Sequence, residues 1–281
     1  MFSGRKILAY LQITRFLNFV ITFLVIIVAT VISIEGAYST FKIIFAGLSG
    51  ALAASAGNVI NDYFDINIDQ INKPGRVLPS GRLTKKEAFS FYIFLSVSAL
   101  IVSSFININA FITVFTASVL LFFYSYQVKK IPLLGNTLIS CLTALAFIYG
   151  GIAVNNIDAA LIPASFAFVI NFIREIIKDM EDAEGDRQQN INTYPVKYGF
   201  RKAKNIVVIV TAILIILTLH PFIFNIYTIE YFLVVMVLVN PLLIYIVKSL
   251  FENDSIKNLN KLCNLLKLNM IIGLTAIFLG K

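Results

Sequence analysis

Charged residues are scarce in this sequence of 281 residues: only 14% are Asp, Glu, Lys or Arg. A soluble domain carries about 25%, whereas here 58% of the residues are apolar and the mean hydropathy is +0.85. The chain therefore has too few polar side chains to cover a globule in water. The same numbers exclude a disordered chain, and the composition predicts a membrane protein.

Cysteine and histidine are rarer still. Cys141 and Cys263 both lie in apolar or amphipathic stretches, and this single pair matches neither a disulfide framework nor the spacing of a metal site. The one histidine, His220, directly precedes Pro221 at the end of an apolar segment. We interpret it as a residue at the membrane interface rather than as a ligand.

What the sequence has instead is long apolar segments. They are continuous over about 20 residues, the length with which a helix crosses ~30 Å of hydrocarbon, and they lack the alternating pattern of transmembrane β-strands. We predict an all-α polytopic membrane protein of nine transmembrane helices around a central cavity. The predicted spans are Phe16–Ile34, Phe41–Ile60, Ala88–Ile106, Ala110–Tyr126, Leu134–Val154, Ala159–Ile177, Ile206–Leu219, Tyr227–Val247 and Leu262–Leu279.

The basic residues predict the orientation, because Lys and Arg concentrate in the cytoplasmic loops of membrane proteins. With a cytoplasmic N-terminus, these spans place all of the 23 Lys and Arg residues on the inner side except Lys42 and Lys281. We therefore predict that the N-terminus is cytoplasmic. The net charge of +8 follows from this topology, and nucleic-acid binding is not needed to explain it.

Most of the acidic residues lie in two runs, at the inner ends of the second and sixth spans. The first acidic run contains Asp62, Asp65 and Asp69, and the second contains Asp179, Asp182 and Asp186. The spacing of i, i+3 and i+7 is the same in both, with a constant offset of 117 residues. This repetition predicts two equivalent helix pairs with one chemical task.

On a continuous helix, residues at i, i+3 and i+7 share one face, so each acidic run is expected to direct its carboxylates the same way. Such anions repel one another, and the negative end of the helix dipole adds to the cost. They need cations, and hard oxygen ligands suit Mg²⁺. Asn58, one turn before Asp62, offers a further oxygen. The alternative is that these carboxylates are solvated loop residues paired with nearby Lys and Arg.

Basic residues accompany both acidic runs. Two facing runs with these cations would form a Mg²⁺-bridged clamp for a diphosphate, in which metal and basic groups stabilise the charge on the departing group. The candidate cations are Lys73, Arg76, Lys129, Lys130 and Arg174.

The motifs resemble those of the UbiA superfamily of intramembrane prenyltransferases. Residues 61–69 match its NDxxDxxxD motif, residues 179–186 match its second DxxDxxxD motif, and residues 72–81 resemble its NRPLPSG-like loop, with Val77 where many members carry Pro. The resemblance implies that Asn58 and both acidic runs bind metal, and that the six Asp residues are catalytic. It also implies that Lys73, Arg76, the Tyr126–Lys129 element and the polar pair Arg15 and Asn18 contact the diphosphate.

The resemblance also implies the reaction, a Mg²⁺-dependent transfer of a prenyl group from a polyprenyl diphosphate. Residues 174–186 are most similar to archaeal members that transfer a geranylgeranyl group from geranylgeranyl diphosphate to the hydroxyl of geranylgeranylglyceryl phosphate. An aromatic acceptor such as 4-hydroxybenzoate is the alternative within the family. A cation transporter is a weaker alternative, because transport pathways place charge in mid-membrane whereas these acids lie at one end.

The implied organisation is a single intramembrane domain over residues 1–281 in the cell membrane. Loops 61–87 and 178–204 are expected to cap an active site that faces the cytoplasm. The expected partners are the prenyl diphosphate, the acceptor and the lipid bilayer.

Overall fold

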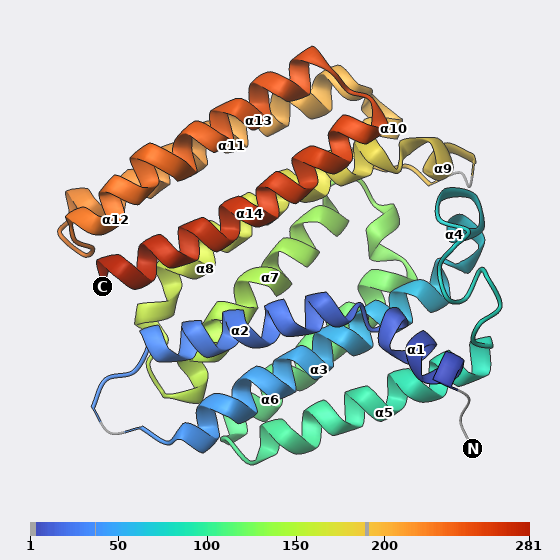
Figure 1. Cartoon of the computed structure of the whole chain (residues 1–281), viewed down its shortest axis with the longest axis horizontal. Helices are drawn as coiled ribbons and strands as arrows, with labels where there is room; N and C mark the ends of the chain where they lie inside the picture. Colours follow the sequence, from blue (N-terminus) through green and yellow to red (C-terminus); the bar gives the residue numbers. More distant parts are fainter. Residues whose placement is uncertain (1–3, 37, 189–190) are drawn as a thin grey trace. The chain divides into compact units, whose positions relative to one another are not determined.

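The structure is a computed structural model that describes residues 4–36, 38–188 and 191–281. All regular elements in these ranges are helices (Figure 1). They are α1 (Gly4–Ile13), α2 (Phe16–Ile32), α3 (Thr40–Phe64), α4 (Ile66–Asn72), α5 (Lys85–Ser104), α6 (Ile108–Tyr126), the 3-10 turn η1 (Val128–Lys130), α7 (Leu134–Ala153), α8 (Asp158–Glu181), α9 (Ala183–Gln188), α10 (Tyr194–Tyr198), α11 (Phe200–Ile223), α12 (Ile229–Val234), the π-helical turn η2 (Val235–Val239), α13 (Asn240–Glu252) and α14 (Ile256–Gly280).

Eight of the helical segments described are long and apolar enough to cross a membrane. They are α3, α5, α6, α7, α8, α11, the continuous stretch Ile229–Glu252, and α14. The first predicted span corresponds to α2, which has 17 residues and meets α1 at an angle of 50°. If that bent pair is one crossing, the number rises to nine. The multi-pass helical architecture is therefore present, and the ninth span and the cytoplasmic N-terminus stay predictions.

The corner between α1 and α2 is a strained turn. Arg15 has φ 55° and ψ 64°, a left-handed conformation that is unfavourable for residues with a side chain. The corner is held by two hydrogen bonds: Thr14 Oγ1 donates to the carbonyl of Leu11 at 2.8 Å, and Asn58 Nδ2 donates to the carbonyl of Thr14 at 3.1 Å. Such strain is often found at functional positions.

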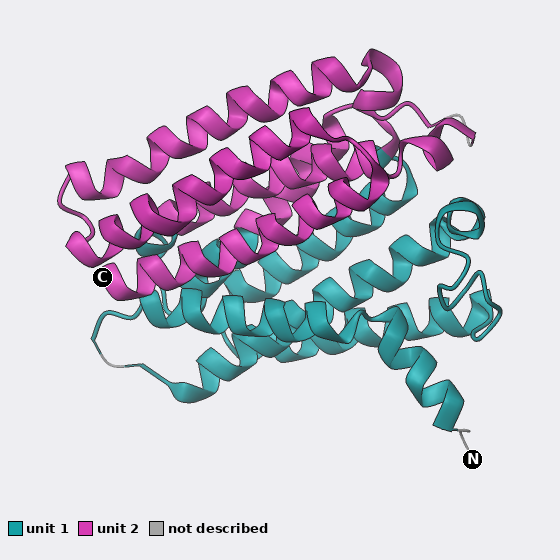
Figure 2. Ribbon diagram, turned by 45° about the horizontal axis from the view of Figure 1, so that its top comes forward, with its two compact units in different colours: residues 1–129, 145–160 teal, residues 130–144, 161–281 magenta. Residues whose placement is uncertain are grey.

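The chain divides into two compact units, residues 1–129 with 145–160 and residues 130–144 with 161–281 (Figure 2). The first unit is built around α3, against which α2, α5 and α6 pack. Small residues such as Ala46, Ala53 and Ala56 are buried along α3, which lets neighbouring helices approach closely in a membrane. Within this core, the Ser49 and Tyr149 hydroxyls lie 2.6 Å apart and satisfy each other.

The loop that follows α4 is a packed structure. Val77, Leu78 and Leu83 are buried in one apolar cluster with Ile13 of α1 and Val59 of α3. Arg82 also donates to the carbonyl of Gly75 at 2.6 Å and to the side chain of Gln12. The loop is thus fixed against α1 and α3, and this places Arg76 at the end of α3.

The second unit is held by long helices and a few buried polar contacts. Helix α14 packs along α12, η2 and α13. Tyr231 Oη donates to the carbonyl of Thr218 at 2.8 Å, and Asn269 Nδ2 donates to the carbonyl of Val239 at 2.9 Å. The π-helical turn η2 lies just before Pro241, whose missing N–H disturbs the regular helix there.

The expectation that each acidic run lies on one continuous helix is wrong. Helix α3 ends at Phe64 and α4 begins at Ile66, so the interruption falls at Asp65, and the break between α8 and α9 falls at Asp182. The 117-residue offset therefore extends to the helix boundaries. The physical reason is that a new helix start places Asp69 and Asp186 in a first turn, where the helix dipole favours carboxylates.

We predict that Gly150→Ala destabilises the first unit. A Cβ atom at Gly150 would lie 2.7 Å from the backbone nitrogen of Thr30 and 2.8 Å from Ala29 Cβ. Two backbones must then separate, which costs about 1–3 kcal/mol and lowers the melting temperature of the protein in detergent. Gly273→Ala on α14 is the matched control, because nothing lies within 4 Å of its Cβ position. Equal melting temperatures for the two variants would contradict the close contact.

Candidate active site

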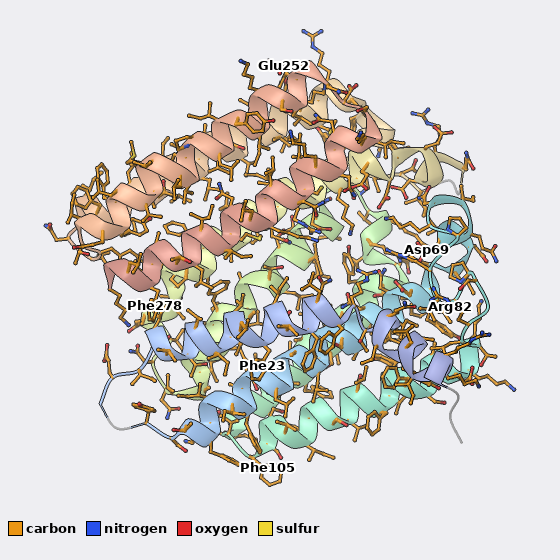
Figure 3. All side chains as sticks on the ribbon, viewed as in Figure 1. Phe23, Asp69, Arg82, Phe105, Glu252 and Phe278 are labelled. Atoms are coloured by element: carbon orange, nitrogen blue, oxygen red, sulfur yellow. The ribbon has the colours of Figure 1, made fainter. Side chains whose placement is uncertain are left out.

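Arg76 brings two carboxylates of the first acidic run together. Its Nη1 atom donates to Asp69 Oδ2 at 2.6 Å and to Asp62 Oδ1 at 3.2 Å. Both aspartates are only 4% exposed, and Figure 3 shows Asp69 on α4 near the loop that carries Arg82. Asp62 and Asp69 thus converge on one guanidinium group, although the helix is interrupted between them.

A second guanidinium group, that of Arg15 near the N-terminus, also contacts Asp62. Arg15 Nη2 donates to Asp62 Oδ1 at 2.8 Å, so the strained corner between α1 and α2 aims this side chain at the end of α3. Asp62 therefore contacts two arginines, which compensates much of the cost of burying its charge.

Asp65 has a separate set of partners. Lys129, just after α6, forms an ion pair with its Oδ1 atom. Asn61 Nδ2 donates to Asp65 Oδ2 at 2.8 Å, and Lys129 also reaches Asn61 Oδ1 at 3.5 Å. Lys129 thus ties the end of α6 to the first acidic run, and its contact with a diphosphate stays a prediction.

The protonation of Asp69 is sensitive to its surroundings. Burial raises the pKa of Asp69 above its usual range because the charged form loses hydration, and the facing guanidinium of Arg76 only partly offsets this effect. A divalent cation in the same place would favour the ionised form more strongly than Arg76 does.

The second acidic run has neutral donors among its partners. Asn136 Nδ2, on α7, donates to Asp179 Oδ2 at 2.8 Å, and Thr193 Oγ1 donates to Asp186 Oδ2 at 3.2 Å. Asn171 extends this polar path along α8 by donating to Ser140 Oγ at 3.4 Å. These bonds orient the carboxylates of Asp179 and Asp186.

Glu175 lies one turn before Asp179 and is bracketed by two cations. Arg174 Nη1 donates to Glu175 Oε1, and Lys178 Nζ lies 3.5 Å from Oε2. Glu175 is 5% exposed, and the Arg174 Nε atom is buried without a hydrogen-bond partner among the described residues. Glu175 therefore holds the candidate diphosphate ligand Arg174 near the C-terminal end of α8.

The other predicted residues lie near the acidic runs in sequence but make different contacts. Asn58 donates to the carbonyl of Thr14, and the backbone N–H of Asn18 donates to the carbonyl of Arg15 at 2.6 Å. Tyr126 packs on Phe64, with 5.5 Å between ring centroids. Lys73 caps α4 and Lys130 is exposed. The roles of these residues in binding metal or diphosphate stay predictions.

Three polar partners of the carboxylates are absent from the residues predicted to form the site. Asn61, Asn136 and Thr193 orient Asp65, Asp179 and Asp186. Asn136 could have been recognised from the sequence, because an amide side chain within an apolar span is costly unless it has a hydrogen-bond partner. Thr193 carries none, because a threonine in a loop is ordinary.

The carboxylate pair fits a magnesium ion that is completed by its substrate. Within the ranges described, no three Asp, Glu, His or Cys side chains are placed to hold one ion. Mg²⁺ typically takes about one or two carboxylates and fills its other positions with water and substrate phosphates. Asp62 and Asp69, gathered at one Arg76 atom, offer such a pair.

Comparison with known proteins decides the family, because residues 20–271 match the UbiA prenyltransferase family. The chain belongs to this family. It is a prenyltransferase, as the acidic motifs imply. Digeranylgeranylglyceryl phosphate synthase from Methanosphaera stadtmanae is 31% identical over 96% of this chain and 98% of the relative. The enzyme of that name from Methanobrevibacter smithii is 34% identical over 96% and 97%.

Solved structures of this family share the fold. A structure of a digeranylgeranylglyceryl phosphate synthase is 33% identical, covers 98% of both chains and superposes with a TM-score of 0.79. A UbiA homologue from Archaeoglobus fulgidus bound to DMAPP and Mg²⁺ is 20% identical, covers 96% of this chain and 99% of the other, and has a TM-score of 0.67. The second likeness establishes the fold alone.

We predict that Asp69 and Arg76 are energetically coupled. Arg76→Gln leaves the buried Asp69 carboxylate without this cation, and Asp69→Asn leaves Arg76 with Asp62 as its remaining carboxylate partner of the pair, so the double variant loses less stability than the sum of the single variants. The expected coupling is about 1–3 kcal/mol in denaturant unfolding. The exposed pair Lys248 and Glu252, neutralised in the same way, should give less than about 0.5 kcal/mol. Additive effects at Asp69 and Arg76 would contradict the ion pair.

Proposed function

We propose that the protein transfers a geranylgeranyl group from geranylgeranyl diphosphate to the free hydroxyl of geranylgeranylglyceryl phosphate and releases diphosphate. The observation that carries this assignment is the similarity to digeranylgeranylglyceryl phosphate synthases over nearly the full length of both chains. Because this similarity extends over 96–98% of this chain, it supports the same reaction for the whole chain.

The carboxylates and cations form the diphosphate end of the proposed site. Mg²⁺ would be held by Asn58 and the Asp residues of both acidic runs, and when bound it supplies a Lewis acid for the leaving diphosphate. The Archaeoglobus fulgidus homologue of the same fold binds DMAPP with Mg²⁺, which supports this choice of metal. Arg15, Asn18, Lys73, Arg76, Tyr126, Lys129, Lys130 and Arg174 are proposed to position the diphosphate.

In the proposed reaction the C1–O bond to diphosphate breaks while a new C1–O ether bond forms to the acceptor hydroxyl. Arg15, Arg76 and Lys129 already lie against the carboxylates, and they would turn to the diphosphate and stabilise the charge that grows on it. The acceptor hydroxyl loses its proton in the same step. Asp69 and Asp186 are the candidate acceptors for that proton.

We further propose that the whole chain acts as one intramembrane domain in the cell membrane, with the active site facing the cytoplasm. The loops 61–87 and 178–204 would cap the site, since each carries a whole acidic run and begins in the last turn of a membrane-spanning helix. The distribution of Lys and Arg supports this orientation.

The test is a turnover assay on the purified protein with radiolabelled geranylgeranyl diphosphate and Mg²⁺. Geranylgeranylglyceryl phosphate and 4-hydroxybenzoate are offered as rival acceptors. We expect a Mg²⁺-dependent diether product. Asp62→Asn and Asp182→Asn should each lower kcat/KM by at least about 100-fold, because each removes a carboxylate from the metal and diphosphate site.

Glu35→Gln is the matched control, because Glu35 is an exposed carboxylate on the connection between α2 and α3, distant in sequence from both acidic runs. Transfer to 4-hydroxybenzoate alone would show that the acceptor is not the lipid, although the protein would still be a prenyltransferase. Activity that survives the removal of Mg²⁺, or both aspartate substitutions, would refute the metal site.

A further inference from the structure

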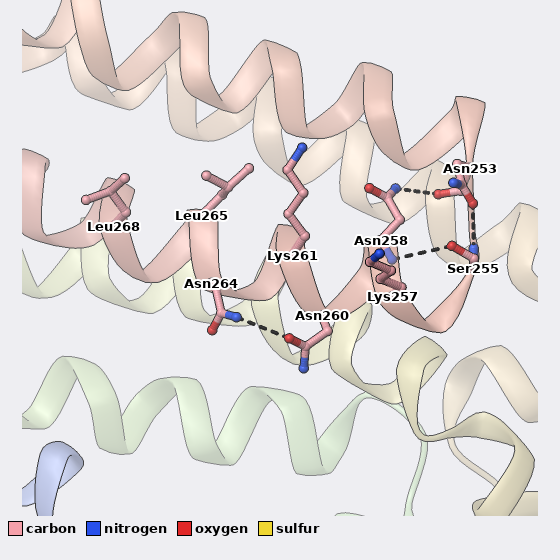
Figure 4. Close-up of a pocket in the computed structure, with 9 residues that line it drawn as sticks. All are labelled: Asn253, Ser255, Lys257, Asn258, Asn260, Lys261, Asn264, Leu265 and Leu268. Carbon is pink, nitrogen blue, oxygen red and sulfur yellow. Dashed lines mark hydrogen bonds between the residues drawn. The ribbon is translucent and has the colours of Figure 1, made fainter.

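A groove runs along the exposed face of the first half of α14, within the second unit (Figure 4). Lys257, Lys261, Asn264, Leu265 and Leu268 line it. Because these positions are spaced by three or four residues, they share one face of the helix. The groove changes character along α14, from basic and polar at the start of the helix to apolar farther on.

The two lysines give the groove an uncompensated positive charge. Neither ammonium group forms an ion pair with a carboxylate of the described residues, whereas the nearby Lys204 and Lys248 pair with Asp254 and Glu252. Lys261 Nζ instead donates to the hydroxyl of Tyr245 at 2.9 Å and lies 5.4 Å from the centre of that ring. Two unneutralised cations on one helix face are complementary to an anionic group.

Amide side chains and leucines complete the lining. Asn260 and Asn264 lie beside the lysines and are joined by a hydrogen bond of 3.2 Å. Leu265 and Leu268 follow deeper along the helix. Cations and amides suit a phosphate and a glycerol hydroxyl, whereas leucines suit a hydrocarbon chain, so the order along the groove matches an amphiphile that enters from the membrane boundary.

The groove is connected to the second acidic run. Asn260 Nδ2 donates to Glu181 Oε1 at 2.9 Å, and Glu181 directly precedes Asp182. Cys263, on the same turn of α14, contacts the carbonyl of Arg174 through its sulfur at 3.9 Å. One residue that lines the groove, Asn260, is therefore hydrogen-bonded to the residue that directly precedes Asp182.

We propose that this groove binds the glycerol phosphate headgroup of the lipid acceptor, with the phosphate at Lys257 and Lys261 and the start of the prenyl chain along Leu265 and Leu268. The proposal rests on the proposed function, because it assigns a binding place to the substrate that accepts the prenyl group. The hydrogen bond between Asn260 and Glu181 favours the acceptor over ordinary membrane lipid, since it links the groove to the proposed reaction site.

The test measures binding and turnover on the full chain in detergent. The double variant Lys257→Gln/Lys261→Gln removes both charges and keeps the chain length close to that of lysine. Binding of geranylgeranylglyceryl phosphate is measured without Mg²⁺ and without prenyl diphosphate, so that no reaction occurs. We expect Kd and KM for this lipid to rise about tenfold, as for the loss of a charge-assisted hydrogen bond, while KM for geranylgeranyl diphosphate stays unchanged.

Two further variants and one rival lipid complete the design. Lys257→Arg/Lys261→Arg should retain binding, and Lys248→Gln, an exposed lysine on the neighbouring α13, should leave it unchanged. Dioleoylphosphatidylglycerol is the rival anionic lipid. An unchanged Kd for the acceptor lipid in the glutamine variant would overturn the proposal, and so would an equal loss for both lipids.

The failure of this proposal is distinguishable from that of the proposed function. If the wild type and the glutamine variant turn over geranylgeranylglyceryl phosphate equally well, the groove is not the binding site of this lipid, but the proposed reaction stands. If the wild type binds this lipid through the two lysines but never prenylates it, the groove is a binding site for the lipid and the proposed reaction is wrong.

Discussion

Negative charge buried at the end of a membrane-spanning helix is the constraint on which the rest of the site depends. The first acidic run meets it with three cations from different parts of the chain: Arg15 from a strained corner, Arg76 from a packed loop and Lys129 from the end of α6. The burial of Val77 fixes the loop that carries Arg76, and the hydrogen bond from Asn58 to the carbonyl of Thr14 fixes the corner that carries Arg15. In the proposed reaction, these same cations are the groups that a diphosphate would engage.

The repetition between the two halves extends beyond sequence spacing. The helix breaks at Asp65 and Asp182 fall at equivalent positions, and each places the last carboxylate of its run in a new first turn, where the helix dipole favours it. The partners differ, however: cations surround the first run, whereas Asn136 and Thr193 are neutral donors to the second.

The transmembrane helices and the two acidic runs could be predicted from the sequence, because apolar length and exact repetition of spacing are local signals. The seventh predicted span, 206–219, was too short at both ends, since α11 extends from Phe200 to Ile223 and includes polar residues that hydropathy leaves out. The helix breaks could not be predicted, because i, i+3 and i+7 fit a continuous helix equally well. The contact between Arg15 and Asp62 depends on a left-handed corner that no local sequence pattern marks.

Asp62 and Asp69 are proposed to form a metal site that the diphosphate completes. Calorimetric titration of Mg²⁺ into the protein, with and without an unreactive thiolodiphosphate analogue of the prenyl donor, tests it most directly. We expect Mg²⁺ alone to bind weakly and to bind much more tightly when the analogue is present. Because such coupling is reciprocal, Mg²⁺ must increase the affinity for the analogue by the same factor. Tight binding of Mg²⁺ that is indifferent to the analogue would contradict this expectation.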